Sequence, residues 1–80
     1  MKFVPVQSRM ARAALGWGIR ELAGSAKVSI DTVARFERGE ELKERTVDAI
    51  RHALVAAGIE FIDENGGGPG VRLRKRQKPK

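Results

Sequence analysis

The sequence predicts a small, mainly α-helical domain that is followed by a short β-hairpin and a basic tail. Its 80 residues suffice for one domain. Four successive segments carry apolar residues at helical spacing, and after Gly58 the pattern changes to one typical of strands. We therefore expect an all-α fold of four to five helices over residues 1–58, a hairpin over residues 59–74 and a disordered tail over residues 75–80.

The first two helices are expected on either side of Gly16. Pro5 can open the first helix, because the first backbone N–H of a helix has no intrahelical acceptor to lose. Its predicted inner face consists of Met10, Ala11, Ala14 and Leu15. The second helix begins near Gly18, and its predicted inner face consists of Ile19, Leu22, Ala23 and Ala26.

The third and fourth helices have clear boundary signals. Ser29 is a good N-cap for the third helix, because its hydroxyl can accept a hydrogen bond from an otherwise unpaired backbone N–H. Val33 and Phe36 are expected to point inward, and Gly39 supplies a C-terminal stop. The fourth helix is expected over residues 43–57, with an inner face of Val47, Ile50, Leu54 and Ala57.

Two short strands are expected to pair beyond the helices. Residues 59–62 are β-branched and aromatic, residues 71–74 alternate apolar and basic side chains, and the loop between them is rich in glycine. An isolated two-stranded hairpin is marginally stable in water, so it needs support from the helices or from a second subunit. We assign a dimer contact to its apolar residues, which are Ile59, Phe61, Ile62, Val71 and Leu73.

The positive charge is concentrated at the C-terminal end. The formal net charge is +6, but residues 1–64 contain ten basic and ten acidic residues, whereas residues 65–80 contain six basic residues and no acidic one. A basic tail on a neutral body indicates a polyanionic partner, most simply a nucleic acid. The alternative is a tail that only aids solubility.

Composition argues against several other classes of function. With no Cys and one His, the chain has neither a disulfide framework nor a zinc ligand set. No nucleophile–base pair is evident, so we expect neither an enzyme nor a cofactor. The apolar runs are far shorter than the ~20 residues that span a bilayer, and no apolar leader segment follows Lys2. We therefore expect no membrane association and a cytoplasmic location.

The middle of the chain has the spacing of a helix-turn-helix. Two short predicted helices are separated by a turn of a few residues, which is also found in many small helical bundles. The residues are more specific than the spacing. The pattern comprises Leu22-Ala23, Ala26-Lys27-Val28-Ser29, Thr32-Val33 and Phe36-Glu37-Arg38-Gly39. It resembles the Xre/Cro-like (lambda repressor-like) family of helix-turn-helix transcriptional regulators over roughly residues 6–57.

This resemblance implies a lambda repressor-like DNA-binding domain of bacterial, phage or mobile-element origin. Three positions depart from the family pattern. Gly18 stands where a Ser or Thr cap is usual, and Ile19 stands where a Gln usually contacts a phosphate. Lys27 replaces the usual turn glycine, so either it adopts a left-handed or strained backbone, at a cost of roughly 1 kcal/mol, or the turn differs from that of the family.

The outward side of the third helix carries the candidate base-reading residues. Arg35 can make a bidentate contact with guanine, and Ile30 can pack on a thymine methyl group. Asp31 either accepts from a cytosine amino group or stabilises the helix N-terminus. The residues expected at phosphates are Lys27, Ser29, Thr32, Arg38, Lys43, Arg72 and Arg74. Glu37 is expected to form an ion pair with an arginine rather than to contact DNA.

Two functions from different classes follow from these residues. The first is a sequence-specific transcriptional regulator that binds double-stranded DNA as a homodimer, and the family resemblance implies that it acts as a repressor. Two subunits would then read the half-sites of an inverted repeat ~34 Å apart in the major groove. The alternative is a protein-interaction module with the same fold, such as an antitoxin or an anti-activator.

Overall fold

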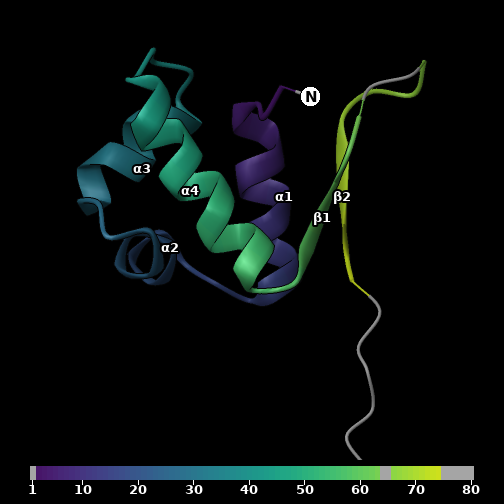
Figure 1. Cartoon of the computed structure of the whole chain (residues 1–80), viewed down its shortest axis with the longest axis horizontal. Coiled ribbons are helices and arrows are strands. Elements are labelled where there is room, and N and C mark those ends of the chain that lie inside the picture. Colours follow the sequence, from purple (N-terminus) through teal and green to yellow (C-terminus); the bar gives the residue numbers. More distant parts are fainter. Residues whose placement is uncertain (1, 64–65, 75–80) are drawn as a thin grey trace, which may run out of the picture.

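Four α-helices precede a two-stranded antiparallel sheet (Figure 1). The computed structural model describes residues 2–63 and 66–74. The helices are α1 (Pro5–Leu15), α2 (Ile19–Ala26), α3 (Ile30–Glu37) and α4 (Glu44–Ala56), and the strands are β1 (Ile59–Ile62) and β2 (Gly70–Leu73). The predicted helices and hairpin are thus confirmed, with β2 one residue earlier than expected. The basic tail predicted at residues 75–80 lies outside the described residues.

All four helices contribute to one core. Val33 and Phe36 point inward from α3, at 0% and 5% exposure, as the sequence predicts. Phe3, which precedes α1, stacks on Phe36 with a centroid distance of 5.0 Å and meets Phe61 of β1 edge-on, also at 5.0 Å. The extended N-terminal segment therefore joins α3 to the hairpin through aromatic contacts. None of the helices within residues 2–63 and 66–74 has the length and apolar character needed to cross a bilayer.

Local signals define the helix ends. Gly16 ends α1 in the left-handed region with φ 71°. Lys27 ends α2 with φ 61° and ψ 43°, so of the alternatives stated for this position the structure shows the left-handed backbone. Ser29 caps α3, because its Oγ accepts from the backbone N–H of Thr32 at 3.0 Å. The turn between α2 and α3 is therefore only three residues long, and both helices adjoining it have fixed ends.

The predicted inner face of α1 needs a correction. Ala14 is exposed, whereas Gln7 and Ser8 are buried at 1% and 0% exposure beside Ala11. Each polar side chain has a distant partner, because Ser8 donates to Glu37 and Gln7 donates to the hairpin backbone. A buried polar group with its hydrogen bonds made is tolerated in a core. Apolar periodicity alone could not identify such a face.

The hairpin packs on the helices of its own chain. β1 and β2 pair with Ile59 opposite Leu73 and Phe61 opposite Val71. Ile59 is 1% exposed, so the dimer contact predicted for it is wrong: its side chain belongs to its own core. Phe61 and Val71 also pack against that core and are half-buried. Ile62 and Leu73 are the hairpin's exposed large apolar residues, at 37% and 52%.

Candidate nucleic-acid interface

The three candidate base-reading residues lie on the exposed side of α3. Ile30 is 43% exposed, and the side chains of Asp31 and Arg35 are 73% and 40% exposed. The opposite side of the helix is buried against the core through Val33 and Phe36. Helical spacing and this burial together leave one solvent-facing surface on α3, which we call the α3 face and define as Ile30, Asp31, Ala34, Arg35 and Arg38.

A depression next to the α3 face brings together residues that are separated in the sequence. It has a volume of about 370 Å³ and lies between α3 and the start of α4. Thr32 and Lys43, both predicted at phosphates, line it together with Arg35. Its other lining residues are Glu41, Leu42 and Thr46. A hydroxyl, an ammonium and a guanidinium thus share one concave surface, which suits a ligand with anionic oxygens.

The turn before α3 holds two more of the predicted residues. Lys27 is exposed and held in its left-handed conformation. Ser29 Oγ lies 2.7 Å from Thr32 Oγ1 in addition to accepting from the Thr32 backbone N–H. The primary role of Ser29 is therefore the predicted cap, and Thr32 is tied to it.

Arg72 and Arg74 do not join this surface. Arg72 Nε donates to Glu60 Oε1 at 2.8 Å, and Arg74 Nη2 donates to the Val55 carbonyl at 3.1 Å. The hairpin and α3 lie at opposite ends of the molecule's long axis (Figure 1). The two arginines predicted at phosphates are therefore separated from the α3 face of the same subunit.

One acidic residue near the α3 face was missed by the sequence analysis. Glu40 Oε2 accepts from Arg38 Nη2 at 2.9 Å, and its Oε1 lies 3.8 Å from Arg35 Nε. Asp31 Oδ2 lies 3.6 Å from the same Arg35 nitrogen. The signal in the sequence was Gly39, because a left-handed glycine after a helix turns the chain back over the last helical turn.

A buried ion pair fixes the end of α3 against α1. Arg12 Nη2 and Nε donate to the two carboxylate oxygens of Glu37 at 2.7 and 2.9 Å, and Ser8 Oγ donates to Oε2 at 2.6 Å. Burial acts to raise the pKa of Glu37, but the hydrogen bonds and the charges of Arg12 and Arg9 outweigh it and lower that pKa. The hydrogen bond to Glu37 likewise raises the pKa of Arg12, against the effect of burial. The ion pair predicted for Glu37 is thereby confirmed.

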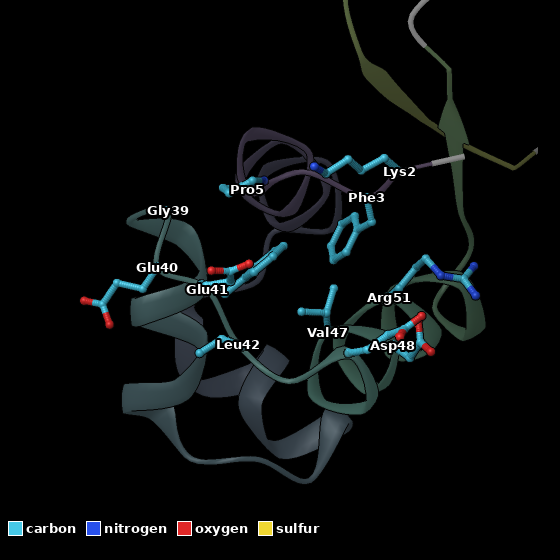
Figure 2. Close-up of a pocket in the computed structure, with 12 residues that line it drawn as sticks. Lys2, Phe3, Pro5, Gly39, Glu40, Glu41, Leu42, Val47, Asp48 and Arg51 are labelled. Atoms are coloured by element: carbon cyan, nitrogen blue, oxygen red, sulfur yellow. The ribbon is translucent and has the colours of Figure 1, made fainter.

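A groove with a volume of about 530 Å³ lies between the N-terminal segment and α4 (Figure 2). Figure 2 shows Phe3 and Val47 pointing toward one another across it, while Glu40 points away toward solvent. Its apolar lining includes Phe3, Phe36, Leu42 and Val47, its acidic residues are Glu40, Glu41, Glu44 and Asp48, and its basic residues are Lys2 and Arg51. Acidic residues thus outnumber basic ones around an apolar floor.

Comparison with known proteins does not assign the chain to a family. No protein-family model matches this chain, and no curated protein matches it significantly.

Proposed function

We propose that this chain is a sequence-specific DNA-binding regulator that inserts α3 into the major groove. The observation that carries the proposal is the shared surface of Arg35, Thr32 and Lys43, which combines a potential base reader with two potential phosphate ligands. A guanidinium fork suits the two acceptors of guanine, while hydroxyl and ammonium groups suit backbone oxygens. The resemblance of residues 22–39 to Xre/Cro-like regulators favours the same docking mode.

The proposed regulator acts as a homodimer. A helix of eight residues contacts too few base pairs for useful specificity, and a two-fold axis doubles the number that are read. Ile62 and Leu73 provide exposed apolar side chains on the hairpin. Each of the two strands also has an outer edge without a strand partner among the described residues. Exposed edges of this kind readily pair with another chain.

Selection of bound sequences from a random pool of duplex DNA tests this function. The proposal predicts recovery of an inverted repeat whose half-site centres are about one helical turn apart. Recovery of unrelated sequences, bound with equal affinity, contradicts it. A parallel titration with salt should give a linear fall of log K with log salt, because phosphate contacts release counterions.

A protein-interaction module is the second candidate function, and the acidic-rimmed groove of Figure 2 favours it. Its occupant would be a segment of another protein that places Lys or Arg side chains around an apolar one, matching the acidic rim and apolar floor. Asp31 and Glu40 also offset the charges of Arg35 and Arg38. Pull-down from nuclease-treated extract separates the two functions, because only a protein partner survives removal of the DNA.

A further inference from the structure

The C-terminal turn of α3 places the Glu40 carboxylate between two arginines. Gly39 has φ 93°, its N–H donates to the Phe36 carbonyl at 3.0 Å, and the Glu40 N–H donates to the Arg35 carbonyl at 3.0 Å. This pair of backbone hydrogen bonds is the one that a left-handed glycine makes at the end of a helix. The backbone of Glu40 is therefore fixed to the last turn of α3, and its side chain starts beside those of Arg35 and Arg38.

The two acids approach Arg35 from the side of Nε. Asp31 Oδ2 and Glu40 Oε1 lie 3.6 and 3.8 Å from this nitrogen, which is buried and makes no hydrogen bond. The two terminal guanidinium nitrogens of Arg35 likewise donate no hydrogen bond to a residue within 2–63 or 66–74. The Arg35 side chain is 40% exposed. The fork of terminal N–H groups therefore makes no hydrogen bond with the described residues. The Nε end of the guanidinium lies near the carboxylates of Asp31 and Glu40.

We infer that Asp31 and Glu40 are positioning residues that hold the Arg35 guanidinium for a guanine base. The inference rests on the proposed function and identifies what the α3 face selects. Guanine presents two acceptors, O6 and N7, at the spacing of an arginine fork. Because the Arg35 guanidinium is already held from its Nε side, its side chain should lose less conformational entropy when it binds guanine. Asp31 accordingly supports the base reader and does not itself read cytosine.

Glu40 has a second effect, on binding that is independent of sequence. Its Oε2 accepts from both Nη2 and Nε of Arg38, at 2.9 and 3.3 Å. An arginine paired in this way must exchange its carboxylate for a phosphate before it can strengthen binding to arbitrary DNA. Glu40 therefore weakens generic attraction while it favours the guanine contact, and both effects raise the ratio of specific to non-specific affinity.

Glu40→Gln tests the inference, because it keeps the side-chain size and removes the charge. Asp48→Asn is the matched control: it removes the same charge from an exposed acidic residue of α4 that does not line the depression beside Arg35 and has no ion pair with a described residue. Affinity is measured by fluorescence anisotropy for the selected duplex and for duplexes with each guanine replaced in turn. Glu40→Gln should reduce the discrimination at one guanine by about tenfold, within the range of one bidentate contact. Its affinity for non-specific DNA should rise, and its log K against log salt slope should steepen by about 1.

A measurement on the free protein separates failure of this inference from failure of the proposed function. The ¹⁵N relaxation of Arg35 Nε–Hε should report a more mobile side chain in Glu40→Gln than in the wild type or in Asp48→Asn. If the wild type selects a sequence but the two variants change base discrimination and Arg35 mobility equally, the inference is overturned and the function stands. If the wild type selects no sequence, the proposed function fails and the inference falls with it, whatever the mobility of Arg35.

Discussion

Arg12 of α1 and Glu37 of α3 form an ion pair whose atoms lie 2.7 Å apart, and the Glu37 side chain is only 6% exposed. Ser8 also donates to this carboxylate, and Arg9 donates to the Glu37 backbone carbonyl, so side chains of α1 hold the last turn of α3 through four hydrogen bonds. The position of the α3 face relative to the rest of the domain therefore depends on a group that touches no DNA in the proposed docking mode.

Glu37 should make stability depend on pH in the acid range. Burial favours the neutral acid, but the hydrogen bonds and positive charges prevail and keep its pKa below the ordinary 4.5. A carboxyl with a lowered folded-state pKa stabilises the fold above its unfolded pKa, and this contribution is lost as pH falls through the folded value. Glu37→Gln should lower the free energy of unfolding by about 2 kcal/mol at neutral pH and should flatten the acid limb. Urea unfolding across this pH range measures both, and an acid limb equal to that of the wild type contradicts the assignment.

Gln7 should be the main polar attachment of the hairpin. Its Nε2 donates to the carbonyls of Gly70 at 3.0 Å and Ile62 at 3.4 Å, and its Oε1 accepts from Val4 N–H at 3.0 Å. Gln7→Leu should cost about 1–3 kcal/mol, because partly buried backbone groups lose their partners. Amide hydrogen exchange over β2 should accelerate. The control is Val6→Ala at the exposed neighbouring residue, which should change the free energy of unfolding by no more than about 0.5 kcal/mol. Equal effects of the two substitutions would argue against Gln7 as an attachment of the hairpin.

The left-handed backbone at Lys27 should destabilise the free protein, and the Lys27 side chain should offset that cost only when it contacts DNA. Lys27→Gly removes the strain of φ 61° and should raise the free energy of unfolding by about 1 kcal/mol. Gly24→Ala in α2, where an added Cβ meets nothing within 4 Å, should give a gain of about 0.5–1 kcal/mol. In DNA binding the two variants should differ: Lys27→Gly should reduce the salt slope by about 1, and Gly24→Ala should leave it unchanged. Identical slopes would remove Lys27 from the phosphate contacts.

The hairpin should mediate self-association through its two exposed apolar residues. Replacing both Ile62 and Leu73 by Lys places charge where the proposed contact is apolar, so the dimer should dissociate while the monomer stays folded. Sedimentation velocity measures the mass of each species, and circular dichroism checks the fold. Ile30→Lys, a change at an equally exposed apolar residue of α3, should leave the mass unchanged. A dimer that survives the double substitution places the contact elsewhere.

The sequence predicted the elements well because their boundaries depend on local chemistry. Ser29 caps the helix that follows it, Lys27 ends α2 in the left-handed conformation, and Val33 and Phe36 keep their spacing in the core. These features need only neighbouring residues.

The errors concern groups whose partners are distant in the sequence. The predicted inner face of α1 did not include Gln7 and Ser8, which are buried with hydrogen-bond partners 63 and 29 residues away. Ile59 reads as a candidate for a partner subunit, yet its own chain covers it. Glu40 was not among the predicted site residues, because only the turn at Gly39 places it beside Arg38. Pairings across the fold, unlike helix ends, cannot be read from local spacing.

Whether the α3 face distinguishes base pairs can be measured with Arg35→Ala on the selected duplex and on its single-base-pair variants. Arg35→Ala should weaken binding to the selected duplex by about 1–3 kcal/mol, with the four bases becoming equivalent at one position and preferences elsewhere retained. An unchanged affinity and an unchanged pattern of base preferences would contradict it.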